Sequence, residues 1–179
     1  MAEDNTTTFA DERRRLLHEL DVERNQFIRN VETCRIRDIE RPFIGEWSLK
    51  DIVGHIASWE AEVVTAFRDI REGKRPALLD FDTAHLDAWN QDHVERKRDL
   101  NFWSLMEQLR GGRQRLLEEL AAVSDEDLGS ENSIHARLVR STMDHDRGHW
   151  HEIAARLAGM PGARSEGHVS IPEEAASAN

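Results

Sequence analysis

The sequence has one cysteine, Cys34, which excludes a disulfide within the chain and is typical of a protein kept in a reducing compartment. It has no apolar run near the roughly 18 residues that a membrane-spanning helix requires. Its first residues lack the apolar core of a secretion signal. These absences predict a cytoplasmic protein that works away from the membrane.

Positive charge is also in short supply. Lysine and arginine number 24 against 35 aspartates and glutamates, which gives a net charge of −11. Because such a surface repels phosphate groups, the charge argues against broad binding to nucleic acid or to anionic membranes. The basic runs Arg13–Arg15 and Arg96–Arg98 have acidic neighbours and are typical of solvated helix faces.

The length and composition of the chain fit one compact domain. It has 179 residues, of which 39% are hydrophobic and 33% are charged. We assign residues 1–160 to this domain. Residues 161–179 are rich in alanine, glycine, serine and proline and are predicted to form a mobile tail.

Apolar residues recur with helical spacing over most of the chain, and strand signals are few. Long helices are predicted at about 8–33, 48–73, 101–120 and 133–158, and a shorter one at about 83–98. Thr8 is the expected N-cap of the first helix, and residues 124–127 are expected to form a turn or a short capped helix. Pro42 and Gly45 interrupt the pattern after the first helix. The predicted fold class is all-α.

The second helix has the clearest start in the sequence. Ser48 and Asp51 form an acidic variant of the capping box, and Trp47 before the cap can pack on Ile52. An apolar stripe continues from Ile52 along this helix. His55 lies about 60° from Ile52 around the helix, so it borders the face turned to the core.

Two histidines of the last helix, His145 and His149, are four residues apart and project from one face about one turn apart. They share that face with Ile134, Leu138 and Ile153. This spacing lets one helix offer two neutral imidazoles to one divalent ion such as Zn, Ni or Fe. A tightly held ion needs a third ligand from another helix, and His55 is the natural donor.

Other interpretations of these histidines stay open. The chain has nine histidines, so one pair at this spacing has roughly even odds of arising by chance, and a hydrogen-bonded pair without metal is the alternative. His151 lies about 120° from His145 around the helix and should point elsewhere. Asp144 and Asp146, each about 100° from His145, are poor candidates for ligands.

Glu152 is better placed, only about 20° from His145 around the helix. Its carboxylate is a candidate for a hydrogen-bond acceptor behind a metal ligand, for a fourth ligand or for a catalytic general base. A salt bridge with Arg147 or Arg156 is the structural alternative. A di-iron carboxylate site is disfavoured, because it needs paired Glu-x-x-His segments on two helices.

Three segments resemble the DinB-like superfamily, which includes DinB/YfiT-type proteins, the metal-binding domain of mycothiol-dependent maleylpyruvate isomerase and the ClbS/DfsB group. The segment Trp47–Glu60 resembles its second-helix signature, and Leu86–Asn90 resembles a further stretch with an Asp and an Asn three apart. The segment His145–His149, followed by Glu152, resembles its last-helix His-x-x-x-His pattern. The likeness spans residues 8–160 in the same order.

The resemblance implies a four-helix bundle with up-down-down-up connectivity, whose long crossover matches the connection at 71–82 that contains Pro76. It implies a trihistidine metal site, which falls on His55, His145 and His149. It also implies that the protein is a homodimer. Several members of the family are thiol-dependent S-transferases or isomerases and some are hydrolases, so a low-molecular-weight thiol is a candidate cofactor.

These observations lead to one functional hypothesis and one rival. The hypothesis is a metal-dependent enzyme acting on a small molecule, as a thiol-dependent S-transferase or a hydrolase. Glu152 is then the candidate catalytic residue, and Trp59, Trp89 and Asn90 are candidates for the wall of the cofactor pocket. The rival is a non-catalytic metal-binding protein that acts in stress or binds a ligand.

Overall fold

The structure is a computed structural model that describes residues 2–159. The predicted tail at 161–179 lies outside the described residues. Within them the fold is all-α apart from one small hairpin, as the sequence predicts. The helices are α1 (Ala2–Thr33), α2 (Leu49–Arg71), α3 (Thr83–Arg96), α4 (Phe102–Ala121), α5 (Asp125–Gly129) and α6 (Ile134–Leu157). The hairpin pairs β1 (Pro42–Ile44) with β2 (Trp47–Ser48), and short 3-10 turns occur at Ile36–Asp38 and Ala77–Asp80.

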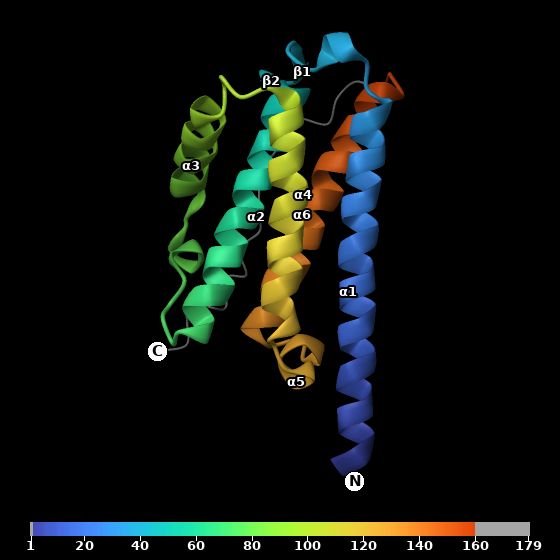
Figure 1. Cartoon of the computed structure of the whole chain (residues 1–179), viewed down its shortest axis with the longest axis vertical. Coiled ribbons are helices and arrows are strands. Elements are labelled where there is room, and N and C mark those ends of the chain that lie inside the picture. The colour runs from blue at the N-terminus through green and yellow to red at the C-terminus, as the bar shows by residue number, and fades with distance from the viewer. Residues whose placement is uncertain (1, 160–179) are drawn as a thin grey trace.

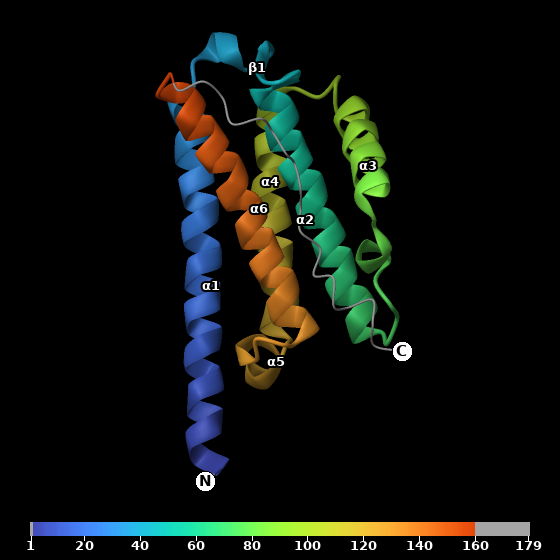
Figure 2. The same cartoon turned by 180° about the vertical axis from the view of Figure 1, so that it is seen from behind.

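The long helices α1, α2, α4 and α6 lie roughly parallel to the long axis of the molecule (Figure 1). Helix α1 packs mainly on α6, and α2 packs mainly on α4. Helices α1 and α6 run in one direction and α2 and α4 in the other, as Figures 1 and 2 show. Helix α3 lies in the connection between α2 and α4 and packs on the outer side of α2.

Side-chain caps fix where the helices begin. The predicted capping box of α2 is present: the Ser48 hydroxyl accepts from the Asp51 N–H at 3.2 Å, and Asp51 accepts from the Ser48 N–H at 2.9 Å. Ser133 caps α6 in the same way, through the N–H of Ala136. The first helix begins earlier than predicted, so Thr8 lies inside α1 and is not its cap. The residues before Thr8 contain no proline or glycine, so nothing in the sequence stops the helix from starting earlier.

A polar layer divides the apolar core into two clusters. One cluster includes Leu20, Trp59, Val63, Leu116 and Met143, and the other includes Phe27, Ile56, Leu109 and Ile153. On each long helix a buried charged residue falls between them: Arg24 on α1, Glu60 on α2, Arg113 on α4 and Asp146 on α6. Along α2 and α6 the buried histidines lie within about five residues of this layer.

No helix among residues 2–159 combines the length and the apolar character needed to cross a membrane.

Candidate metal centre

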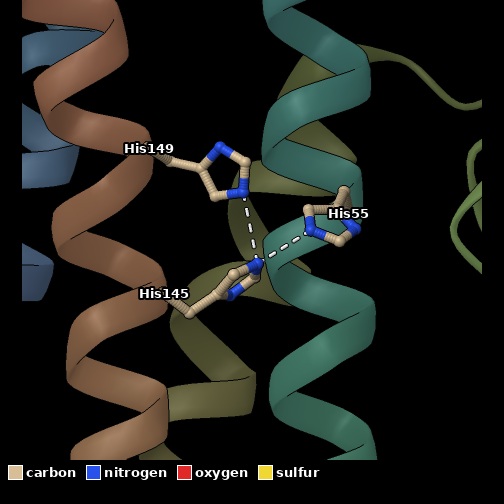
Figure 3. A group of neighbouring side chains, drawn as sticks. All are labelled: His55, His145 and His149. Carbon is tan, nitrogen blue, oxygen red and sulfur yellow. Dashed lines mark hydrogen bonds between the residues drawn. The ribbon is translucent and has the colours of Figure 1, made fainter. Parts of the chain in front are cut away.

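The three predicted ligands come together between α2 and α6 and are called the histidine cluster below (Figure 3). The Nε2 atom of His145 lies 2.8 Å from Nε2 of His55 and 3.2 Å from Nε2 of His149. All three side chains are buried, with exposed fractions of 0% for His55, 8% for His145 and 4% for His149. The candidate ligand atoms lie within 4.8 Å of one another, so the cluster could hold one metal ion.

Burial keeps the rings of His55 and His145 in the form that binds metals. Burial first, and then the charge of neighbouring His145 and His149, hold the pKa of His55 well below its ordinary value. The pKa of His145 is lowered by burial, then by His149 and by Arg24. At neutral pH His55 and His145 are therefore uncharged, and each keeps a nitrogen lone pair for a ligand bond.

The Nε2 atoms of His55 and His149 both face Nε2 of His145, an arrangement that suits a cation. His149 Nδ1 lies 3.1 Å from Glu152 Oε2, and a carboxylate only accepts, so the proton of a neutral His149 sits on Nδ1. Its Nε2 then presents a lone pair to Nε2 of His145. Since His145 Nε2 also faces His55 Nε2, a single proton at that atom cannot satisfy both contacts. A metal ion accepts all three lone pairs, and Zn–N bonds of about 2.0–2.1 Å place ligand nitrogens about 3.3 Å apart in a tetrahedron.

Three tryptophans surround the histidine cluster. The ring centroid of Trp47 is 5.0 Å from that of His55, Trp89 is 6.2 Å from His55, and Trp59 is 5.6 Å from His145. Trp59 and Trp89 also meet edge to face at 5.7 Å, so two of the predicted wall residues adjoin the cluster.

Four buried polar atoms at or beside these aromatic rings lack a hydrogen bond among the described residues. Two are Nδ1 of His55 and Nδ1 of His145, and the other two are Trp59 Nε1 and Asn90 Oδ1. Asn90, the third predicted wall residue, follows Trp89 on α3 and is itself buried. Because an unpaired buried donor or acceptor costs free energy, these atoms are suited to hydrogen-bond a bound water or ligand.

Glu152 contacts the outer nitrogen of His149 rather than the inner face of the cluster. Of the roles considered for it, this position favours an acceptor behind a ligand over a fourth ligand. The structural alternative for Glu152 was a salt bridge with Arg147 or Arg156. Arg147 does not fill that role, because it pairs with Glu23 and Asp144. His151 is exposed and stacks on Trp150, away from the cluster.

Sequence reasoning missed a closed set of buried ion pairs that we call the ion-pair ring: Arg24, Glu60, Arg113 and Asp146. Arg24 meets Asp146 through Nε and Nη2 at 3.0 Å each and meets Glu60 at 2.8 Å. Arg113 meets Glu60 at 2.6 Å and Asp146 at 2.9 Å. Burial opposes the charge of Arg24, but the two carboxylates outweigh it and raise the pKa of Arg24. One signal was available: Arg24 and Arg113 interrupt apolar stripes at helical spacing.

Lys97, also missed, follows the last residue of α3. Its ammonium donates to the carbonyl of Gly54, next to His55, at 3.1 Å. Burial lowers the pKa of Lys97 to about 8, and among the described residues it has no ion-pair partner. The charge of Lys97 is one of the smaller causes that lower the pKa of His55. A half-buried cation therefore stands beside the turn of α2 that carries one candidate ligand.

Comparison with known proteins gives a family and a fold. The family model described as the DinB superfamily matches residues 19–153. A crystal structure of an uncharacterised protein from Escherichia coli UTI89 is similar, with a TM-score of 0.69 and 14% sequence identity. The similarity covers 83% of this chain and 95% of that protein, and at this identity it shows the fold alone. No curated protein matches the chain.

Proposed function

We propose, from the premise that this chain belongs to the DinB superfamily, that it binds one divalent ion through His55, His145 and His149 and acts on a small molecule. Metal binding is general in this superfamily. The observation that carries the proposal is the convergence of three buried Nε2 atoms, with spacings of 2.8 and 3.2 Å around His145. Zn, Ni and Fe all accept such a set of imidazoles.

Three protein ligands leave a coordination position open, which is typical of catalytic rather than structural metal sites. A bound divalent ion would supply Lewis acidity that lowers the pKa of a water or a thiol in that position. Glu152 holds the Nδ1 proton of His149 and so aims its Nε2 into the site. Trp59 Nε1 and Asn90 Oδ1 offer one donor and one acceptor to the substrate.

We propose two reaction classes for this site, transfer of a low-molecular-weight thiol to an electrophile and hydrolysis. The test begins with protein purified without a histidine tag, whose metal content is measured. The loaded protein is then incubated with glutathione, bacillithiol or mycothiol and a panel of electrophiles, and separately with hydrolysable esters and amides. Products that disappear in His149→Ala support the enzyme. Protein without stoichiometric metal, whose melting temperature ignores chelators, refutes the metal site.

The burial of the histidine cluster favours a second candidate, a non-catalytic metal-binding protein. The most exposed ring, His145, has only 8% of its surface accessible, which restricts the approach of a substrate. Metal binding without turnover on any of the panels would select this candidate.

Three further assignments belong to the same proposal. We assign residues 1–160 to one four-helix bundle with up-down-down-up connectivity, in which α3 lies in the crossover. We propose a homodimer located in the cytoplasm. Light scattering coupled to size-exclusion chromatography tests the dimer, and a mass of one chain refutes it.

A further inference from the structure

We propose that the ion-pair ring positions the two helices that carry the metal ligands and thereby sets the affinity of the site for its ion. The inference rests on the proposed function, because it assumes that the histidine cluster binds metal. It assigns Arg24, Glu60, Arg113 and Asp146 as positioning residues rather than ligands or catalytic groups.

The ring takes one charged residue from each of the four long helices and is closed. Both carboxylates accept from both arginines, at distances from 2.6 to 3.0 Å. Its two positive and two negative charges balance, so no net charge is buried. Arg113 also donates to the carbonyl of Leu20 at 2.7 Å, which ties α4 to α1. Displacing any one helix therefore breaks contacts to at least two others.

Both carboxylates lie on the helices that carry the candidate ligands. Asp146 directly follows His145 on α6, and Glu60 comes five residues after His55 on α2, about 7.5 Å along the helix. Because the same two guanidinium groups hold both carboxylates, they connect α2 to α6 close to the gap that an ion would span. The Nε2 atoms of His55 and His145, on those two helices, are 2.8 Å apart.

A gain in stability does not by itself explain why the protein has such a ring. Replacing a buried ion-pair network by apolar side chains of similar volume is often neutral or stabilising, and the best-attested use of such networks is to fix register. Here apolar clusters lie on both sides of the ring and could have continued through it. The packing has also adapted to it: a Cβ at Gly112 would come 3.1 Å from Glu60 Oε2, so α4 presents a glycine there.

The test compares Arg24→Met with Arg13→Met. Both arginines lie on α1, which carries no ligand, and both join α1 to other helices. Arg13 donates to the carbonyl of Leu120 at 2.9 Å and pairs with Asp125 at 3.4 Å, far along α1 from the cluster. Zinc affinity is measured by competition with a chromophoric chelator under conditions where each variant is folded. Cobalt spectra report the ligand geometry directly.

We expect Arg24→Met to weaken zinc binding roughly 10-fold, the lower end of the loss seen when a group in contact with a metal ligand is removed, and to alter the cobalt spectrum. Arg13→Met should lower the melting temperature and leave both metal readouts as in the wild type. Should Arg24→Met fail to fold, Arg24→Lys keeps the charge, loses the paired contact to Asp146 and should give a smaller loss in the same direction.

Two results overturn the positioning role. One is an Arg24 variant that binds zinc as tightly as the wild type while losing stability. The other is an equal loss of affinity in Arg13→Met, which would tie affinity to general destabilisation. Failure of the proposed function is a separate result, because in that case the wild type itself binds no zinc.

Discussion

Removing the carboxylate of Glu152 is expected to weaken metal binding without removing a ligand. Glu152 Oε2 lies 3.1 Å from His149 Nδ1, and the two side chains are only 14% and 5% exposed, so water screens the contact little. Losing such a partner usually costs about 10- to 100-fold in metal affinity, or about 1.4–2.7 kcal/mol. Glu152→Ala should fall in this range, because His149 loses the acceptor that fixes its tautomer and ring orientation.

Glu152→Gln separates the two contributions of that carboxylate. An amide oxygen still accepts from Nδ1 but carries no charge, and a neutral hydrogen bond is about half as strong as a charge-assisted one. We therefore expect a loss of roughly 3- to 10-fold for Glu152→Gln.

Affinities are measured by zinc competition at pH 7.5, with His151→Ala as the matched control, since its exposed ring stacks on Trp150. Wild-type affinity in Glu152→Ala would refute the orienting role. An equal loss in His151→Ala would attribute the effect to the end of α6 in general.

His145→Ala should abolish stoichiometric metal while circular dichroism stays helical, and chelator should lower the melting temperature of the wild type alone. In the metal-free protein His55 and His145 resist protonation when folded, whereas the unfolded chain takes up protons below about pH 6.5. Their contribution to the unfolding free energy, measured by urea titration, should therefore be fully present above that pH. Below it the unfolding free energy should fall by up to about 1.4 kcal/mol per pH unit for each ring, and a pH-independent value contradicts this. Gly129→Ala should cost at least about 1–3 kcal/mol, because the new Cβ would lie 2.5 Å from the Phe9 carbonyl oxygen. Gly148→Ala, exposed and with open space around its Cβ, should instead gain about 1 kcal/mol of helix propensity, and a loss there would contradict the contact argument.

Much of the fold could be predicted from local signals in the sequence. The Ser48–Asp51 box and the Ser133 cap mark the starts of α2 and α6 because capping involves residues only three apart. The angular positions around one helix were enough to predict that His145 and His149 share a face and that His151 points elsewhere. The His55 assignment needed one long-range assumption, that its helix packs near the last one.

The ion-pair ring could not be predicted in the same way. Arg24 and Arg113 interrupt apolar stripes, but nothing within a single helix identifies their partners. Only the packing of the four long helices brings the members within hydrogen-bond distance. The hairpin of β1 and β2 was missed for a similar reason. It is too short to show an alternating pattern, and Gly45 at φ 58° marks its turn.

The ligands lie far apart along the chain, and this affects how the site is assembled. His55 and His145 are separated by 90 residues, so an ion bound between them acts as a removable cross-link across about half of the sequence. By the loop-entropy relation used for disulfides, closing a loop of this size raises the free energy of the unfolded chain by about 4–5 kcal/mol, provided that the ion stays bound. During synthesis the site cannot form until α6 has left the ribosome. If the cluster binds an ion as proposed, that ion joins the chain only after α1 to α5 have been made, so its supply acts late in folding.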